Sequence, residues 1–322
     1  MLKKILISLF AFLNLSSTLV FGATDWPTKK PIRLIAVFPA GGSVDAVARV
    51  LAPALQSYLG QNIIVENIGG ASGVIGTNAL VNADPDGYTF AVVFDTHGVN
   101  PSLKEKLPYD YKKDLANITL IGTSPMVLAA SKASGITTFK QVIEESKSGK
   151  ASSYGSIGAG SLGHLAMASL ALKQGFPWTH IPYKGGGPMM QDALAGHIPL
   201  AVGSIYLIKP HADSGRVIPL AVTSPKRNKD MPNVPTIAEN GFPGFDAPAW
   251  WGVIGSAKTP PDILKKMNEA VIHVLKTPEI AKKMDEQGID IIAGGPEVFN
   301  PFLEKQMSIW GKFVIDNKIK EN

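Results

Sequence analysis

The chain has 322 residues, of which 45% are hydrophobic, and it carries a formal net charge of +5 and no cysteine. This length allows two domains or one large one, with the composition of a globular protein. The lack of cysteine excludes a disulfide scaffold, a thiol nucleophile and a lipid-modified N-terminal cysteine. The positive charge is mild and scattered, which excludes the basic stripe of a nucleic-acid-binding protein.

The N-terminus has the pattern of a secretory signal peptide. Lys3 and Lys4 precede the apolar run ILISLFAFLNLSSTLVF, and small residues follow it in VFGATDWP. The apolar run is short and interrupted by polar residues, which favours an exported protein over one held by a transmembrane anchor. We expect removal of residues 1–23 by cleavage near Ala23, which lowers the formal net charge of +5 by two, to +3, and leaves a periplasmic protein.

The first part of the mature chain alternates strand and helix patterns. PIRLIAVFPAGG is an apolar run that ends in a turn, and SVDAVARVLAPALQSYLG has apolar residues at helical spacing. A strand in QNIIVENIGG, a helix in ASGVIGTNALVNADPDG and a buried strand in YTFAVVFDTHG follow. This β-α-β-α-β order predicts a parallel sheet with crossover helices.

A second alternation begins near residue 125. ANITLIGTSPMVLAAS is extended, TTFKQVIEESKSG reads as a short helix, and YGSIGAGSLGHLAMASLALKQG reads as strand, turn and helix. Three more strands and a helix are predicted in THIPYKG, IPLAVGSIY, RVIPLAVTS and GGPMMQDALAGHI. The restart of the pattern indicates a second, similar α/β domain.

The C-terminal part adds an extended run, AWWGVIGSA, and two helical tracts, PPDILKKMNEAVIHVLKTPEIAKKMDEQG and PEVFNPFLEKQMSIWGKFVIDN. Because no sheet of its own remains for this tail, we expect it to fold back on the first domain. The predicted division is domain I over residues 24–124 and 247–322, and domain II over residues 125–246, joined by two chain crossings.

Two glycine-rich turns, VFPAGGSVDAVAR and YGSIGAGSLGHLAM, each leave a strand and enter a helix. The first N–H groups of a helix lack internal partners and lie at the positive end of its dipole, so such a turn can bind an anion. Ser43 and Ser161 also suit ordinary helix caps. Because both turns hold more glycine than a cap requires, we expect them to grip the two ends of a dicarboxylate. Gly42 should then be needed for close approach and for any positive φ.

The second turn contains a literal G-x-G-x-x-G from Gly158 to Gly163. A dinucleotide site also requires an acidic residue at the end of the next strand, where this chain has Pro182, Tyr183 and Lys184. The six histidines show no metal-binding spacing. We therefore expect no cofactor and no metal.

A serine hydrolase is the alternative function. Ser161 lies at a strand-to-helix turn like a nucleophile elbow, and Asp192 and His211 follow in the order Ser, Asp, His. No oxyanion-loop motif precedes Ser161, and His211 reads as part of a polar loop. The sequence therefore favours a binding protein over an enzyme.

Characteristic motifs run through nearly the whole mature chain. They are WPTKKPIRLIAVFPAGGSVDAVARVLA, IIVENIGGASGVIGTNALVNADPDGYT, YGSIGAGSLGHLA, HIPYKGGGPMMQDALAGHI, PLAVTSPKRNKDMPNVPTIAENGFPGFDAPAWWG and TPPDILKKMNEAV. In this combination the chain resembles the Bug family, the tripartite tricarboxylate transporter (TctC-like) periplasmic substrate-binding proteins. The resemblance implies a two-domain α/β periplasmic binding protein of the type II, Venus-flytrap class, with the ligand cleft between the domains.

The resemblance also implies that both glycine-rich turns are ligand loops. The first ligand loop then contains Phe38, Ala40, Gly41, Gly42, Ser43 and Asp45, and the second contains Ser156, Gly158, Gly160, Ser161 and His164. By position, further cleft-lining candidates are Thr96, His97, Tyr183, Lys184, Gly185 and Asp246. The Asp45 carboxylate could receive a bound amine or brace the loop, and His164 could contact ligand or cap Ser161. One departure is DTHGVN, where relatives usually carry a more serine-rich loop, which can alter the ligand.

The implied role is capture of a small organic carboxylate, often a dicarboxylate, for the membrane components of a tripartite tricarboxylate-type transporter. A sensor kinase is the other implied partner, because some relatives serve sensors. Backbone donors and bridging waters read charge and length and not identity, so aromatic, aliphatic, hydroxy and amino acids all remain open. We expect a monomer.

Overall fold

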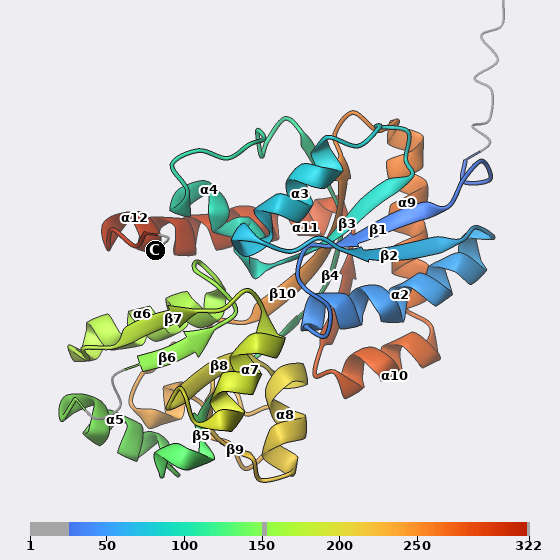
Figure 1. The fold of residues 1–322 in the computed structure, drawn as a ribbon. Helices are drawn as coiled ribbons and strands as arrows, with labels where there is room; N and C mark the ends of the chain where they lie inside the picture. Colours follow the sequence, from blue (N-terminus) through green and yellow to red (C-terminus); the bar gives the residue numbers. More distant parts are fainter. Residues whose placement is uncertain (1–25, 150–152, 321–322) are drawn as a thin grey trace, which may run out of the picture.

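The chain is divided between two β-sheets with helices on their faces (Figure 1). The computed structural model describes residues 26–149 and 153–320. The first sheet has the strand order β11-β4-β10-β3-β1-β2, and the second has the order β7-β6-β8-β5-β9. This architecture agrees with the predicted α/β class.

The first sheet is mixed and not purely parallel. Its strands are β1 (Ile32–Ala36), β2 (Ile63–Asn67), β3 (Thr89–Phe94), β4 (Leu115–Ser124), β10 (Ala249–Ser256) and β11 (Asp290–Gly294). β1 pairs in parallel with β2 and β3, as the β-α-β pattern predicts. β10 pairs antiparallel with both β3 and β4, and β11 pairs antiparallel with β4. The expected parallel sheet is therefore extended by three strands that include antiparallel pairs.

The second sheet follows the same plan on a smaller scale. Its strands are β5 (Met126–Ser131), β6 (Ser153–Ser156), β7 (Thr179–Pro182), β8 (Leu200–Ser204) and β9 (Val217–Val222). β6 pairs in parallel with β7 and β8, whereas β5 pairs antiparallel with β8 and β9. The chain enters this sheet at Pro125, directly after β4, and returns to the first sheet between β9 and β10.

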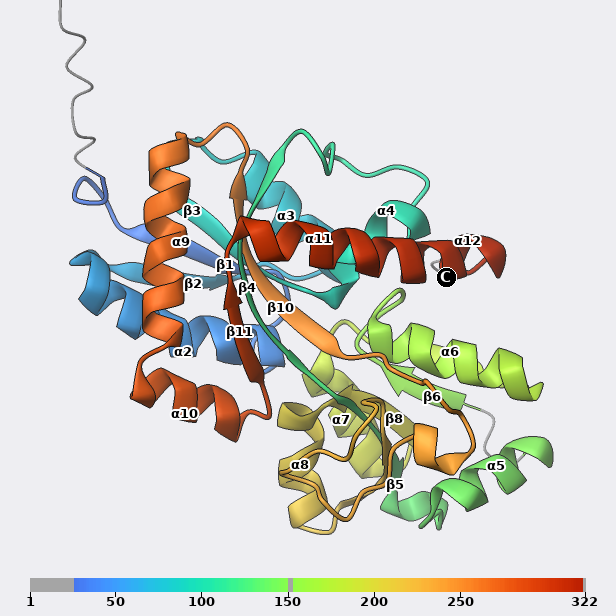
Figure 2. The ribbon, with the colours of Figure 1, turned by 180° about the vertical axis from the view of Figure 1, so that it is seen from behind.

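Helices cover both sheets (Figures 1 and 2). Around the first sheet the helices are α2 (Ser43–Leu59), α3 (Val74–Val81), α4 (Asn100–Leu103), α9 (Pro261–Leu275), α10 (Pro278–Glu286), α11 (Pro296–Gln306) and α12 (Lys312–Asp316), with the π-turn η5 (Met307–Gly311). Around the second they are α5 (Phe139–Lys147), α6 (Leu162–Gln174), α7 (Gly186–Ala195) and α8 (Ile205–Asp213). Short 3₁₀ turns are η1 (Ala71–Gly73), η2 (Asp95–Gly98), η3 (Lys132–Ser134) and η4 (Ala238–Asn240). Within the described ranges, no helix has the length and apolarity needed to cross a membrane.

Two features of the fold differ from the sequence reading. β11 lies between the two helical tracts of the tail, where no strand was predicted, and it joins the first sheet beside β4. His211 lies in α8, so its assignment to a polar loop is wrong. Pro210 within this helix suggested a loop, but α8 packs on β8 and β9, and tertiary packing outweighs the local preference.

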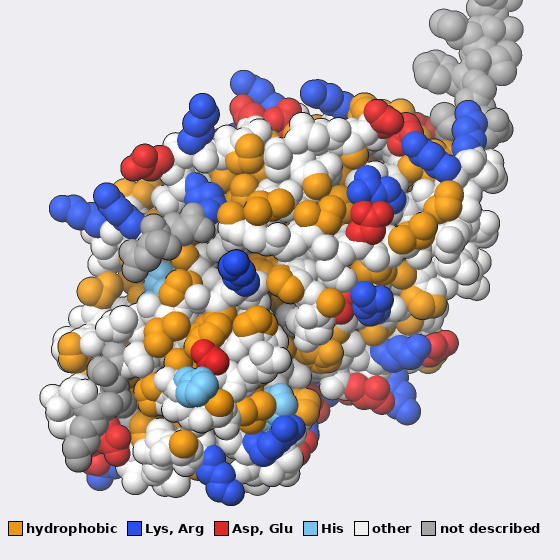
Figure 3. Space-filling view, in the orientation of Figure 1, with side chains coloured by type: hydrophobic (Ala, Val, Ile, Leu, Met, Phe, Trp, Pro, Cys, Tyr) orange, Lys and Arg blue, Asp and Glu red, His pale blue; other side chains and the backbone are white. Residues whose placement is uncertain are grey.

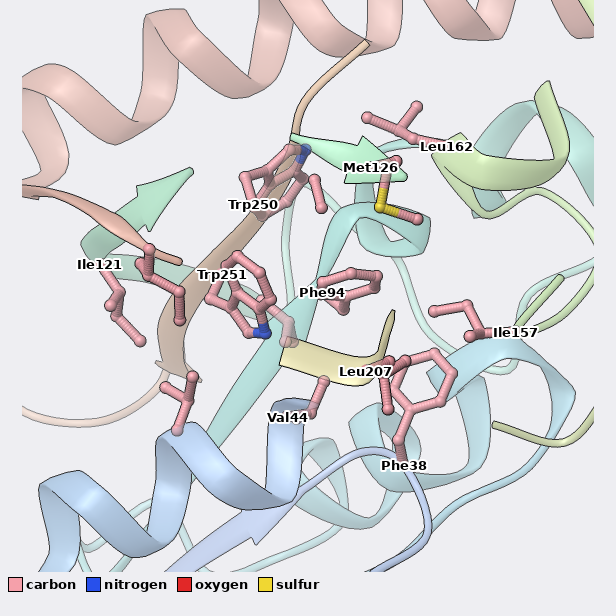
Figure 4. Packing of buried hydrophobic residues seen from close by; sticks show 14 of the residues in the cluster. Phe38, Val44, Phe94, Ile121, Met126, Ile157, Leu162, Leu207, Trp250 and Trp251 are labelled. Atoms are coloured by element: carbon pink, nitrogen blue, oxygen red, sulfur yellow. The ribbon is translucent and has the colours of Figure 1, made fainter. Parts of the chain in front are cut away.

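The core of the first sheet is built on β10 (Figure 4). Trp250 and Trp251 are fully buried on opposite faces of this strand. Trp251 packs against Phe94 of β3 with ring centroids 5.0 Å apart, and Trp250 meets Phe299 of α11 at 5.7 Å. A Cβ at Gly252 would lie 2.3 Å from the Phe299 ring, so glycine at this position lets α11 approach the sheet.

Replacing Phe299 by Ala should lower the free energy of unfolding by about 3–5 kcal/mol, because it opens a cavity beside Trp250. The adjacent change Val298→Ala is a matched control, since Val298 is 39% exposed, and it should cost less than about 1 kcal/mol. Urea unfolding followed by tryptophan fluorescence measures both. Equal losses in the two variants would contradict the role given to Phe299.

Candidate functional site

The loops that follow the parallel strands of the two sheets meet between the sheets. Parallel strands end at the same edge, so the loops after β1, β2 and β3 gather opposite those after β6 and β7. A cavity of about 240 Å³ lies between these loops. Its lining residues are Phe38, Gly70, Ala71, Ser72, Ile157, Gly158, Ala159, Pro182, Tyr183 and Lys184.

The surface on this side has no continuous stripe of one charge. Figure 3 shows apolar side chains gathered along the boundary between the two halves, with lysine, arginine and acidic side chains interspersed around it. Among the described residues that line the cavity, Lys184 is the only charged one. The cavity therefore has a cation at its edge and no carboxylate in its lining.

The first ligand loop is braced from within by Asp45. The Gly41 N–H donates to Asp45 Oδ2 at 3.0 Å, and Asp45 Oδ1 accepts from Arg49 Nε at 2.8 Å and from Asn67 Nδ2 at 3.0 Å. Of the two roles considered for this carboxylate, bracing the loop is the one that these contacts support. Phe38 and Ser43 are buried in the same loop, whereas Ala40 is exposed.

The expected positive φ in this loop belongs to Gly41, at +80°, and not to Gly42, at −87°. A Cβ at Gly42 would make an ordinary contact of 3.5 Å with the Pro39 carbonyl oxygen. Gly42 is the N-cap residue of α2, and no side chain caps this helix. The first-turn N–H groups of α2 therefore stay without a side-chain cap.

A third loop, residues 70–73 after β2, lines the cavity and was not among the predicted site residues. Its four residues all have positive φ, including Ala71 at +47° and Ser72 at +56°. Ser72 Oγ donates to the Ala159 carbonyl oxygen at 2.8 Å across the boundary. Left-handed non-glycine residues are costly and concentrate at functional sites. The signal in the sequence was the Gly-Gly-Ala-Ser-Gly run directly after a parallel strand.

The second ligand loop is held by a network of serine hydroxyls. Ser156 Oγ is 2.7 Å from His180 Nε2 and accepts from the Gly158 N–H at 3.3 Å. Ser161 Oγ donates to the Gly158 carbonyl oxygen at 2.9 Å and accepts from the His164 N–H at 3.2 Å, as an N-cap of α6. Ser156 and Ser161 are both fully buried. These hydroxyls therefore fix the loop.

His164 belongs to the same network. Its Nδ1 accepts from the Gly160 N–H at 3.0 Å, and its ring stacks on His180 with centroids 3.7 Å apart. Burial lowers the pKa of His164 to about 4, and burial together with the neighbouring His164 lowers the pKa of His180 to about 3. Both rings are thus neutral at pH 7. Of the two roles considered for His164, these contacts support the capping one.

The turn η2, directly after β3, carries three buried polar side chains, Asp95, Thr96 and His97. Burial lowers the pKa of His97 to about 4, and its Nε2 has no hydrogen-bond partner within the described residues. The Leu162 N–H, the first of α6, donates to Asp95 Oδ1 at 3.3 Å. This bond joins the two halves. Asp95 was not among the predicted site residues.

The remaining candidates divide into two groups. Tyr183 and Lys184 line the cavity, and a Cβ at Gly185 would lie 3.3 Å from Pro39 of the first ligand loop. Asp246 is exposed and is not in the lining. Burial raises the pKa of Asp246, and the charge that counteracts this is Lys305 on α11. The contacts described here therefore do not join Asp246 to the other candidates.

The residues of the hydrolase alternative do not form a triad. Ser161 bonds within its own loop, and Asp192 accepts from Tyr183 Oη at 2.6 Å. His211 lines a different cavity, of about 330 Å³, beside α7 and α8. Within residues 26–149 and 153–320, no group of three acidic or histidine side chains is arranged to hold a metal.

The comparisons with known proteins, by family, by sequence and by structure, agree with one another. The tripartite tricarboxylate transporter family receptor matches over residues 47–319. Protein BugT of Bordetella pertussis is 32% identical over 301 residues, which is 92% of each chain. Among solved structures, the periplasmic binding protein BugD is 29% identical with a TM-score of 0.86, over 91% of this chain and 99% of that one.

Two solved structures of relatives contain a ligand. One is an R. palustris protein with adipate, 30% identical, with a TM-score of 0.86 over 90% of this chain and 97% of that one. The other is MatC of Rhodopseudomonas palustris with bound malate, 27% identical, with a TM-score of 0.83 over 89% of this chain and 99% of that one. The structural likenesses confirm the predicted two-domain periplasmic-binding-protein fold.

Lowering the pH from 7 to 5 should make His97 and His164 destabilising. Their pKa values in the folded state are about 4, whereas an unfolded histidine titrates near 6.5. Only the unfolded state binds these protons in that range, so the stabilisation is complete above about pH 6.5 and is lost as the pH falls toward 4. At pH 5 each histidine should contribute about 2 kcal/mol less than at pH 7.

The test compares urea unfolding of the parent and of His97→Gln at pH 7 and pH 5. Burial raises the pKa of Asp95, and this shift makes the protein more stable as the pH falls, opposite to the effect of the histidines. The pH-dependent change in the free energy of unfolding of the variant is therefore compared with that of the parent. His97→Gln should remove about 2 kcal/mol of acid destabilisation, whatever its stability at pH 7. An unchanged pH dependence would show that His97 titrates normally.

Proposed function

The chain belongs to the tripartite tricarboxylate transporter receptor family, and we propose that it captures a small organic carboxylate in the cavity between its two sheets. It is a solute-binding protein of the Bug type and not an enzyme. The nature of its solute is the part that we infer.

The charge of the cavity lining is the observation that carries this proposal. Lys184 is its only charged residue within the described chain, and no acidic side chain lines it, so an anion is favoured over a cation. The volume of about 240 Å³ is below the roughly 300–1,000 Å³ typical of drug-sized ligands, which suits a small molecule. The adipate and malate in the two related structures are both small dicarboxylates.

In this proposal the first ligand loop, which contributes Phe38 to the cavity lining, also offers the backbone N–H groups after Gly42 to the anion. The first-turn N–H groups of α2 lack a side-chain cap, and the helix dipole is positive there. In the second ligand loop, the N–H groups of Gly158 and Gly160 donate to side chains of the loop itself. The second loop therefore contributes mainly its shape, and it covers the ligand when the two halves close.

We propose that domain I comprises residues 24–124 and 247–322, that domain II comprises residues 125–246, and that the two close around the ligand. The contact between Ser72 and Ala159, 2.8 Å long, is one that opening would break. Pro125 and the segment between β9 and β10 are the connections about which such a hinge would turn. Venus-flytrap closure of this kind uses few hinge residues.

We also propose export to the periplasm and delivery of the ligand to the membrane components of a tripartite tricarboxylate-type transporter. The family match supports both. The signal peptide and its cleavage near Ala23 fall on residues outside the described part of the chain.

Titration with a panel of dicarboxylates, including malate and adipate, should show one ligand per chain, recovered unchanged. A ligand that binds only the folded state at 100 times its Kd should add about 2.7 kcal/mol to the free energy of unfolding. Diols and diamines of equal chain length are the control and should not bind. If no carboxylate binds, or if one is recovered cleaved, the proposed function is wrong.

Replacing Gly158 by Ala should weaken binding of the same ligand by at least about tenfold, or 1.4 kcal/mol. Gly158 has φ +138°, and a Cβ there would lie 3.1 Å from Ser72 Oγ and 3.5 Å from the Tyr183 carbonyl oxygen, where the loops close. Gly175→Ala is the matched control, since Gly175 also has positive φ but faces open space at the end of α6. It should lower stability by about 1 kcal/mol and leave affinity unchanged. Equal affinities for the two variants would argue against closure at Gly158.

A further inference from the structure

Asp95 lies at the closed boundary between the two sheets. It directly follows β3 and is 1% exposed. Its Oδ1 accepts from the Leu162 N–H of α6 at 3.3 Å, and this bond reaches across from the first sheet to the second. Its Oδ2 has no hydrogen-bond partner among the described residues. One oxygen of this buried carboxyl group is thus unsatisfied.

Within the described part of the chain, no cation is paired with this carboxyl group. Besides β3, η2 packs most closely on α4, α11, β10, η1 and η5, of which only α11 carries ionisable side chains, and it meets α6 through the Leu162 N–H. The ionisable side chains of α11 lie near other residues. Glu304 influences the pKa of Tyr111, Lys305 influences the pKa of Asp246, and Glu297 lies beside Gly295. Two histidines lie close to this contact, His97 two residues after Asp95 and His164 two residues after Leu162, and both are neutral at pH 7 because burial lowers their pKa values to about 4.

The charge state of Asp95 follows from these surroundings. Burial of an ionised carboxylate without a charged partner costs free energy. One helix N-terminus and weak backbone donors do not offset this cost, so the group takes up a proton instead. Burial accordingly raises the pKa of Asp95 well above its ordinary value, and the only opposing effects are the N–H groups of Leu162 and Thr96. With the halves apart, Asp95 would lose its contact with α6 and gain water on that side, which moves its pKa down toward the ordinary aspartate value.

We propose that Asp95 closes against α6 as the neutral acid, so that a dicarboxylate is captured together with one proton. This inference rests on the proposed function. The proton on Oδ2 removes a buried negative charge from the boundary between the halves, where an ionised carboxylate would repel a dianion held in the cavity. An ammonium group on the ligand would find no counter-charge at Asp95, so the site selects dicarboxylates over ω-amino acids of the same length.

The pH dependence follows from the two states of Asp95. Between its open-state and closed-state pKa values, closing takes up one proton, so affinity falls up to tenfold for each pH unit of increase. Affinity becomes independent of pH above the closed-state pKa. Both carboxyl groups of malate and adipate are largely ionised above pH 6.5, and His97 and His164 titrate far below it. This range therefore isolates Asp95.

The test is isothermal titration of adipate and malate between pH 6.5 and 8, in buffers of different ionisation enthalpy, which counts the protons taken up on binding. The wild-type protein should take up protons, toward one per ligand, and bind more tightly at lower pH. The isosteric variant Asp95→Asn should still bind, with uptake near zero and affinity nearly independent of pH. Asp316→Asn, on the exposed side of α12, is the control and should behave as the wild type.

Three outcomes decide the matter. No proton uptake by the wild type, or equal uptake by Asp95→Asn, overturns the inference even if that variant folds poorly, because the wild-type count stands alone. Tighter binding of 6-aminohexanoate than of adipate also overturns it, since that requires an ionised Asp95. If neither these carboxylates nor other members of the panel bind, the proposed function itself fails, and the inference fails with it.

Discussion

The antiparallel pairing of β4 with β10 is the constraint on which the rest of the structure depends. β4 leads out of the first sheet and β10 leads back into it, and the two pair from Ser124 and Ala249 to Leu115 and Ser256. Both connections to the second sheet therefore leave from neighbouring ends of one hydrogen-bonded pair. This arrangement brings the loops of the second sheet to face those of the first, and the buried tryptophans of β10 anchor the pair in the core.

The two glycine-rich loops proposed to bind the ligand are each held by hydrogen bonds within the protein. Asp45 takes the Gly41 N–H and two side-chain donors, and Ser156, Ser161 and His164 tie the second loop to itself. Groups held in this way lose little further entropy on binding, which favours affinity. Because many hydrogen-bond donors already bond within the loops, few remain to bond a ligand. The recognition of a ligand then depends on charge, length and shape more than on many specific bonds.

The boundary between the halves is lined mainly by uncharged side chains. Phe38, Ile157 and Leu207 are buried there (Figure 4), and the polar side chains of η2 are buried beside them. A site that excludes water strengthens every electrostatic interaction inside it. For the same reason it penalises any ionised group that lacks a partner, so burial raises the pKa of Asp95 and lowers those of His97 and His164.

Most of the order of strands and helices, the two glycine-rich turns and the α/β class could be derived from the sequence by itself, because periodicity and turn residues act over a few neighbours. Four predicted residues, Phe38, Gly158, Tyr183 and Lys184, line the cavity. Only the tertiary structure decided that β10 and β11 each pair antiparallel with β4, that His211 is helical, and that residues 70–73 and Asp95 face the second half. Strand pairing, burial and a missing hydrogen-bond partner depend on segments distant in sequence, and no local pattern records which of them will meet.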